Sequence, residues 1–208
     1  HGDAVCQTAH RADCPFPQEM RYELPGLVID NCAMAGRSSK TFREEGRLDD
    51  IAAHIRPGDL LVVSFGHNDA NRAKAERYVS ADAFGESLRP FWDAARSHGA
   101  VCIFASPVAM REFDEAGVCH PSFAAYREAM RAFAAEVGAP FIDLGAATAA
   151  ANTAFGAERC KTRYMWVGAK QDNAHQQNAG ACRTAQAFVQ QLLQDTTPAL
   201  DVLRANFK

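Results

Sequence analysis

The sequence predicts a three-layer α/β domain, in which helices cover both faces of a central parallel sheet. Four short runs are apolar almost throughout, as is typical of strands buried on both faces. These runs are residues 26–31, 59–65, 100–106 and 140–144. Helical patterns lie between and after them, and such alternation favours parallel strands joined by crossover helices.

Local signals predict where the helices begin and end. The segment 47–55 runs into Arg-Pro-Gly-Asp, which stops a helix before the next strand. The segment 80–99 opens with a candidate N-cap, Ser80, and closes with a glycine. Residues 122–138 and 180–194 carry apolar side chains at helical spacing.

The length of the chain suits a single domain over residues 1–208. The net charge is −3, so we expect no nucleic-acid partner and no attraction to a membrane surface. No apolar run approaches the roughly 20 residues that span a bilayer. No secretory leader is visible, so a secreted or periplasmic location and a cytoplasmic one both stay open, as does the oligomeric state.

Seven cysteines do not decide the compartment either, because their number is odd. Cys32 and Cys102 fall at or within predicted strands and are expected to act as small apolar side chains. Four cysteines outside the predicted strands could form disulfides if the protein is exported: Cys14, Cys119, Cys160 and Cys182. No cysteine or histidine pair has the spacing of zinc ligands, so we expect no metal.

Three polar segments follow the predicted strands or precede the last helix, and together they suit one chemistry. Ligands of such sheets bind at the carboxyl ends of the strands. There Gly66-His67-Asn68-Asp69 and the turn around Gly36 offer an amide and a glycine N–H, the donors that an oxyanion needs. Asp172 and His175 share one face of a helical-type turn, as a carboxylate orients an imidazole in a catalytic triad. Singly, each segment is equally explained as a polar turn.

These residues resemble those of a known family. Gly36, the Gly-His-Asn-Asp segment and the Asp-x-x-His pair resemble blocks II, III and V of the SGNH/GDSL hydrolases. The stretch NCAMAGRSSKTF…GR…GD…FGHND, residues 31–69, is most similar to the rhamnogalacturonan acetylesterase-like branch. The resemblance implies a flavodoxin-like α/β/α SGNH-hydrolase fold, and an esterase that removes acetyl groups from plant cell-wall polysaccharide without metal or cofactor.

The resemblance also implies roles for individual residues. His175 is the general base and later the acid, and Asp172 orients it. The oxyanion is held by the Asn68 side chain, the Gly36 N–H and the N–H of the nucleophile itself. Asp69 is expected to be a structural hydrogen-bonding residue of its loop. Ser38 and Ser39 are expected to lie behind the oxyanion loop and to cap the helix that starts there.

The nucleophile is the one departure from the family motif. The family's Gly-Asp-Ser reads Gly2-Asp3-Ala4 here, so the serine position is occupied by Ala4. Either the alanine is an engineered replacement or the protein is a natural pseudoenzyme. Cys6, two residues further on, is a weaker candidate for a substitute nucleophile. The family's first strand precedes this motif, and we expect it to be missing from the sequence or supplied from elsewhere.

Substrate contacts are predicted for a few side chains, each with a structural alternative. Arg111 and Arg37 suit the carboxylates of uronic acids. The alternative for both is a surface ion pair, which is the favoured interpretation of Arg37. Trp166 is a candidate to stack on a sugar ring. His67 is a candidate to line the pocket, or else it is satisfied by its neighbours.

Three functions remain in competition. The first is an O-acetylesterase acting on an acetylated oligo- or polysaccharide. The second is an SGNH esterase or lipase acting on other small esters. The third is a non-catalytic glycan-binding protein. Activity of a variant with the serine restored would separate the third from the others.

Overall fold

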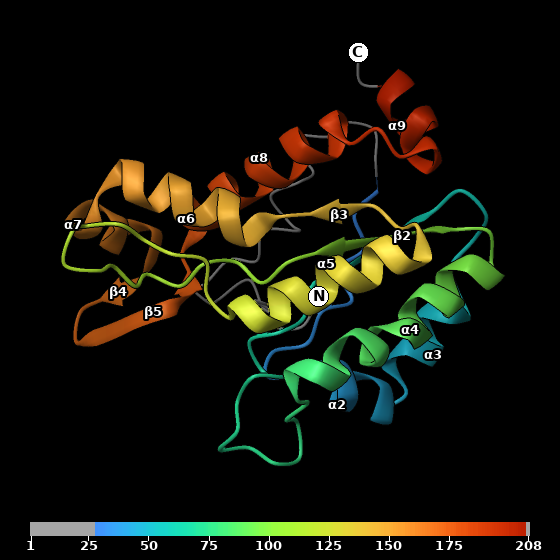
Figure 1. Ribbon diagram of the computed structural model, residues 1–208, viewed down its shortest axis with the longest axis horizontal. Coiled ribbons are helices and arrows are strands. Elements are labelled where there is room, and N and C mark those ends of the chain that lie inside the picture. Colours follow the sequence, from blue (N-terminus) through green and yellow to red (C-terminus); the bar gives the residue numbers. More distant parts are fainter. Residues whose placement is uncertain (1–27, 207–208) are drawn as a thin grey trace.

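A parallel sheet built from three of the four apolar runs forms the centre of the computed structural model, which describes residues 28–206 (Figure 1). The strands are β1 (Leu60–Val63), β2 (Val101–Ala105) and β3 (Phe141–Ile142), in that spatial order. Leu60 pairs with Val101, and Phe104 pairs with Phe141. The α/β class and the parallel sheet are therefore confirmed.

Helices precede, separate and follow these three strands along the chain, and a ribbon of two further strands comes before α8 (Asn178–Gln194). These elements are α2 (Ser39–Glu44), α3 (Arg47–Ala52), α4 (Ala81–Ser97), α5 (Ala124–Val137), α6 (Leu144–Phe155), α7 (Ala157–Cys160), η1 (Lys161–Arg163), β4 (Tyr164–Val167), β5 (Lys170–Gln176), α8, η2 (Pro198–Leu200) and α9 (Asp201–Asn206). None of the helices in the described residues is long and apolar enough to cross a membrane.

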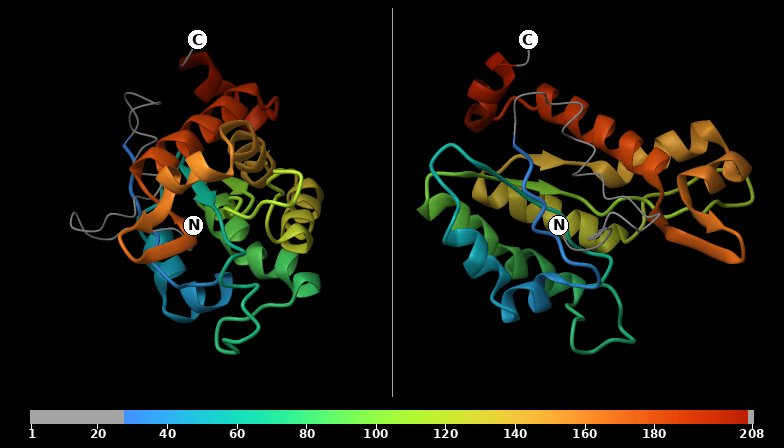
Figure 2. Two further views of the ribbon diagram at one scale, coloured as in Figure 1. Left: turned by 90° about the vertical axis from the view of Figure 1, so that its left-hand side faces the viewer. Right: turned by 180° about the vertical axis from the view of Figure 1, so that it is seen from behind.

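Side chains of β2 alternate between two separate cores, which explains why its sequence is apolar throughout. Cys102 and Phe104 belong to the core beneath α4 and α5. Ile103 and Ala105 belong to the core beneath α8. Helices thus cover both faces of the sheet, and Figure 2 shows these layers edge-on and from behind.

The predicted helix starts match the capping chemistry. Ser38 is the N-cap of α2, and its Oγ accepts the Thr41 N–H at 3.2 Å. Ser80 is the N-cap of α4, and its Oγ accepts the Ala83 N–H at 3.4 Å. Each hydroxyl satisfies one of the backbone donors that the first helical turn leaves unpaired.

The strand expected at residues 26–31 is not present in its described part, residues 28–31. A strand requires a hydrogen-bonding neighbour, and no ladder partner for this segment lies among the described residues. Ile29 nevertheless packs against the core beneath α8, whereas Val28 is 96% exposed. Packing of one side chain, without sheet pairing, accounts for part of the apolar pattern.

The cysteine expectations are met in part. Cys102 is buried in β2, and burial raises the pKa of its thiol. Cys32 is exposed and lies outside any strand, so it is not the buried apolar side chain that was expected. Among the described residues, the cysteines are present as thiols. Cys6 and Cys14 lie outside the described residues.

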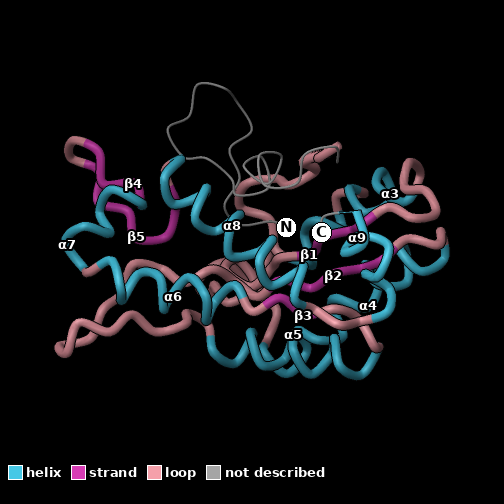
Figure 3. The backbone as a smooth tube through the Cα atoms, turned by 90° about the horizontal axis from the view of Figure 1, so that it is seen from above, coloured by secondary structure: helices cyan, strands magenta, loops and turns pink. Residues whose placement is uncertain are grey.

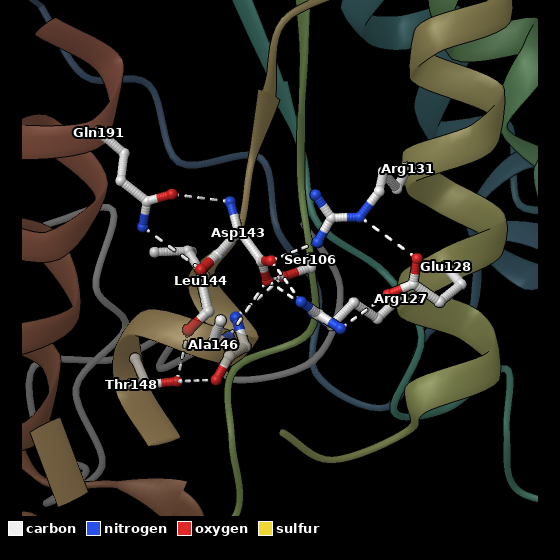
Figure 4. A network of polar contacts seen from close by, with 10 residues as sticks. Ser106, Arg127, Glu128, Arg131, Asp143, Leu144, Ala146, Thr148 and Gln191 are labelled. Atoms are coloured by element: carbon white, nitrogen blue, oxygen red, sulfur yellow. Dashed lines mark hydrogen bonds and ion pairs between the residues drawn. The ribbon is translucent and has the colours of Figure 1, made fainter. Parts of the chain in front are cut away.

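A carboxylate network joins the carboxyl ends of β2 and β3 to helices on both faces of the sheet (Figure 4). Asp143 caps α6 and accepts two bonds from Arg127, at 2.7 and 2.6 Å, and another from Arg131. Ser106, which directly follows β2, donates its hydroxyl to Asp143 at 3.2 Å. Gln191 of α8 accepts the Asp143 N–H at 2.9 Å. The network therefore fixes the edge of the sheet where ligands are expected.

Candidate active site

Asp172 and His175 form a close pair in β5. Oδ2 of Asp172 lies 2.8 Å from Nδ1 of His175. Oδ1 of Asp172 accepts the backbone N–H groups of Ala174 and His175 at 2.9 and 3.0 Å. These two bonds fold the chain back over the aspartate, as in other turns built on an Asx side chain. The His175 side chain is 45% exposed, so a ligand can reach the ring.

The local structure that brings the pair together differs from the helical-type turn predicted from the spacing. In a regular strand, residues three apart point to opposite faces. In the antiparallel β4–β5 ribbon, however, Trp166 lies opposite Gln171 and Tyr164 lies opposite Gln176, so five steps along β5 face only two along β4. The additional residues of this bulge form the turn. The prediction of a helical turn is wrong, because a bulged ribbon positions the two side chains.

Hydrogen bonding keeps Asp172 ionised. Burial by itself would raise the pKa of this carboxyl. The N–H donors of His175 and Ala174, together with the nearby imidazole, outweigh burial and lower the pKa below its ordinary value. An ionised carboxylate can accept a hydrogen bond from the Nδ1–H of His175 and stabilise the ring when it becomes charged.

Asn173, between the two members of the pair, anchors this turn to the loop that follows β2. Its backbone oxygen accepts the Arg111 N–H at 2.7 Å. Its side-chain oxygen accepts the indole N–H of Trp166 at 2.9 Å and a guanidinium N–H of Arg111 at 3.3 Å. Sequence reasoning did not single out Asn173, although it lies inside the Asp-x-x-His motif.

Arg111 and Trp166 lie together behind the turn. The guanidinium carbon of Arg111 lies 4.7 Å from the centre of the Trp166 ring. Two other N–H groups of Arg111 bond the Ala157 carbonyl oxygen, at 3.1 and 2.8 Å. The Arg111 side chain is only 11% exposed. This geometry favours the structural alternative for Arg111, in which its donors hold the protein rather than a uronic acid.

Gly36 and Asn68, the candidate oxyanion donors, lie on neighbouring segments. Gly36 has φ +77°, a left-handed conformation that glycine adopts without strain. Nδ2 of Asn68 donates to the backbone oxygen of Arg37 at 3.3 Å, which joins the two segments directly. The structure thus brings the side-chain amide next to the glycine turn. Arg37 itself pairs with Glu45 at 3.0 Å, which is the surface ion pair considered for it.

Asp69 holds this half of the site from within the protein. Its fully buried carboxylate accepts the N–H and the hydroxyl of Ser39, at 2.9 and 2.6 Å. It also accepts the Gly66 N–H at 3.1 Å. The loop after β1 is thereby fastened to the start of α2, and the prediction of a structural hydrogen-bonding role for Asp69 is confirmed.

His67 contacts Phe123, an aromatic residue that the sequence did not indicate. The ring centres lie 4.8 Å apart, in an edge-to-face arrangement. Phe123 has φ 55°, and among the described residues it is the only one other than glycine with a positive φ. A bulky side chain in this conformation carries strain, which is common near functional sites. The contact places one face of the site against an aromatic ring, and both the role of His67 toward a ligand and the alternative that its neighbours satisfy it stay predictions.

Both halves of the site belong to the carboxyl edge of the sheet. The β4–β5 ribbon lies at the end of the molecule toward which the three parallel strands run (Figures 1 and 3). The bond from Arg111 to Asn173 ties this ribbon to the loop after β2. Ala4, the predicted nucleophile position, lies outside the described residues. Those residues contain no group of three or more His, Cys, Asp or Glu side chains arranged to hold a metal ion.

Comparison with known proteins finds a matching family and similar sequences. Residues 2–180 match the GDSL-like Lipase/Acylhydrolase family. Rhamnogalacturonan acetylesterase RhgT of Bacillus subtilis is 35% identical over 187 residues, which cover 86% of this chain and 79% of the relative. A second protein of that organism, named "Probable rhamnogalacturonan acetylesterase YesY", is 39% identical over 156 residues, covering 74% of this chain and 71% of the relative.

A solved structure extends the likeness to three dimensions. The crystal structure of the YxiM protein of Bacillus subtilis aligns with 93% of this chain, with a TM-score of 0.84 and 28% sequence identity. The alignment covers 55% of the YxiM chain, so this chain spans about half the length of that structure.

Proposed function

Because the chain belongs to the GDSL-like lipase/acylhydrolase family, we propose that its site is that of a carbohydrate O-acetylesterase. The proposed substrate is an acetylated plant polysaccharide of the pectic, rhamnogalacturonan type. One observation carries the proposal. Oδ2 of Asp172 lies 2.8 Å from Nδ1 of His175, in a turn held by hydrogen bonds from backbone N–H groups to the aspartate. That is the supporting half of a Ser-His-Asp mechanism.

In the proposed reaction, a serine hydroxyl at position 4 attacks the carbonyl carbon of the acetyl ester and passes its proton to His175. Asp172 stabilises the imidazolium that forms. The negative charge that develops on the carbonyl oxygen is stabilised by the Gly36 N–H, the Asn68 amide and the N–H of residue 4. The imidazolium then protonates the departing sugar oxygen. Water, activated by His175, releases acetate from the acetyl-enzyme and restores the serine.

A polar sugar is preferred over a fatty acyl chain for two reasons. Two relatives are named as rhamnogalacturonan acetylesterases. The loop after β1, residues 66–79, also carries mostly polar and charged side chains, whereas an acyl chain would need apolar lining. Hydrolysis of p-nitrophenyl esters of increasing chain length distinguishes the two, since an acetylesterase should lose activity beyond acetate.

A second function is favoured by one specific residue. Ala4 occupies the place of the family's serine, and its methyl group has no oxygen that can attack an ester. A chain with this alanine would bind an acetylated glycan and leave it intact. Whether the alanine replaces a natural serine or is natural decides between an inactivated esterase and a glycan-binding protein.

The experiment compares this chain with the Ala4→Ser variant on p-nitrophenyl acetate and on acetylated rhamnogalacturonan oligosaccharides. We expect the serine to raise turnover by roughly 10⁴–10⁶, the range that loss of a triad member typically costs. In the serine variant, His175→Ala should abolish most of that gain, and Asn68→Ala should lower turnover by about 10²–10³. A folded Ala4→Ser variant without any gain, which still binds the oligosaccharide, would identify a glycan-binding protein.

A further inference from the structure

Three consecutive backbone carbonyl groups in the turn at Gly36 each accept a side-chain N–H. The Ala35 oxygen accepts Nη1 of Arg37 at 2.9 Å. The Gly36 oxygen accepts Nη1 of Arg77 at 3.0 Å, and the Arg37 oxygen accepts Nδ2 of Asn68 at 3.3 Å. Holding each carbonyl also fixes the direction of the N–H of the next residue, because the two groups of a trans peptide point in opposite directions.

The N–H groups of these three peptide units differ in whether they have a hydrogen-bond acceptor. The Arg37 N–H donates to the Met34 oxygen at 3.4 Å, and the Ser38 N–H donates to Oγ1 of Thr41 at 3.0 Å. The Gly36 N–H has no acceptor among residues 28–206. The turn therefore satisfies two of its donors internally and leaves one, Gly36, available for a ligand.

The carbonyl group that shares a peptide unit with the Gly36 N–H belongs to Ala35, and its hydrogen-bond donor is charged. The guanidinium of Arg37 is itself held, because its Nε lies 3.0 Å from both carboxylate oxygens of Glu45. A charged donor on the carbonyl oxygen draws electron density along the peptide unit and makes the N–H at its other end a stronger donor.

We propose that Arg37 is a positioning residue, which orients and polarises the Gly36 N–H for the oxyanion through the Ala35–Gly36 peptide. This role rests on the proposed esterase function. It differs from the uronic-acid contact considered for Arg37, because the side chain acts on the protein's own backbone. Arg77 holds the following peptide unit, whose N–H is already satisfied within the turn.

The chain offers a matched control for a test in the Ala4→Ser background. Arg47 also bonds Glu45, at 2.7 Å, and has an exposure close to that of Arg37, 28% against 33%. No bond joins it to the carbonyls of the turn. Arg37→Met and Arg47→Met therefore remove the same charge and the same ion-pair partner, and only the first removes the donor to Ala35.

Arg37→Met is expected to lower kcat for an acetyl ester by about 3- to 20-fold, with KM changed less than twofold, because it weakens one oxyanion donor without removing it. Arg47→Met should change kcat less than twofold. Arg37→Lys keeps the charge but loses the planar guanidinium group, so its kcat should lie between that of Arg37→Met and that of the parent. An unchanged kcat, an equal loss in both methionine variants, or a rise in KM alone would overturn the proposal.

A second readout does not depend on hydrolysis. The amide resonance of Gly36 in a ¹H–¹⁵N spectrum should move upfield in Arg37→Met and Arg37→Lys, and stay in place in Arg47→Met. This measurement works on the chain with Ala4. If Ala4→Ser proves inactive, the proposed function fails, and the amide shift still decides whether Arg37 polarises the Gly36 peptide. No movement of that resonance would refute the role.

Discussion

Two carboxylates at the carboxyl edge of the sheet, Asp143 and Asp172, are almost equally exposed, at 18% and 20%, yet they have different partners. Asp143 is bound by the guanidinium groups of Arg127 and Arg131. Asp172 is bound by backbone N–H groups and by the imidazole of His175. Burial is therefore not what distinguishes the structural carboxylate from the candidate catalytic one.

The difference lies in whether the partner's charge can change. Guanidinium groups stay protonated at any ordinary pH. The ion pairs of Asp143 therefore persist and hold the ends of β2 and β3 in place. An imidazole can both take up and release a proton, so the Asp172 pair can take part in proton transfer. The comparison leads to three predictions, in which changes at Asp143 act on stability and changes around Asp172 act on turnover.

The largest effect is expected from Asp172→Asn in the Ala4→Ser background. The amide cannot stabilise an imidazolium, so kcat should fall by roughly 10³–10⁴. The free energy of unfolding should change by less than about 1 kcal/mol, because the asparagine oxygen can still accept both backbone N–H groups. Steady-state kinetics and urea unfolding of the same preparations measure the two quantities.

Lys170→Ala is the control for that substitution. Nζ of Lys170 lies 3.5 Å from Oδ2 of Asp172, and its side chain is half exposed. Exposed ion pairs contribute little, so kcat should change less than about threefold. If Asp172→Asn kept kcat within tenfold of the parent, the pair would be only part of a turn.

An intermediate effect is expected at Asp143, as a dependence of stability on pH. Burial would raise the pKa of this carboxyl, but the bonds from Arg127, from the Ala146 N–H and from Arg131 lower it to about 2. The stabilisation is complete above the unfolded value of about 3.8, and is lost as the pH falls from there toward 2. It amounts to about 2 kcal/mol.

Asp143→Asn keeps a side chain that can cap α6 and removes the charge. The variant should lose about 2 kcal/mol at neutral pH, and its unfolding free energy should vary less between pH 5 and 2 than that of the parent. Glu128→Gln is the control, since Glu128 contacts the same two arginines from an exposed position. If the unfolding free energies of Asp143→Asn and the parent changed in parallel with pH, the stabilising role of the Asp143 ion pairs would be contradicted.

The smallest of the three effects is expected from Asn173→Ala. This change removes the acceptor for the Trp166 and Arg111 side chains, and leaves the backbone bond from Arg111 to Asn173 in place. The turn should loosen but persist, so kcat of the serine form should fall about tenfold. Gln171→Ala, at an exposed neighbouring position of β5, should leave kcat within twofold. Equal losses in the two variants would indicate that Asn173 has no special anchoring role.

Sequence reasoning succeeded where a feature depends on neighbouring residues. Ser80 caps the helix that its local sequence predicts. Asn68 follows β1 as predicted, and its side chain reaches the Gly36 turn although the apolar run before that turn is not paired in the sheet. The β4–β5 ribbon was not predicted, because Lys170–Gln176 is polar and lacks the alternation of a strand. Pairing with β4 and anchoring through Arg111 make this segment a strand.

Periodicity and contacts a few residues apart were enough to predict the α/β class, the helix start at Ser80 and the Asp-x-x-His spacing, whereas α6, which begins inside a predicted strand, was not predicted. Which charged and polar groups the protein itself satisfies depends instead on contacts between segments far apart in the chain. Arg111 bonds Ala157 and Asn173, each more than 40 residues away, and Asp143 bonds Gln191 on another helix. Whether an arginine is available to a ligand depends on such distant partners, because its hydrogen bonds form through space and leave no pattern in the neighbouring sequence.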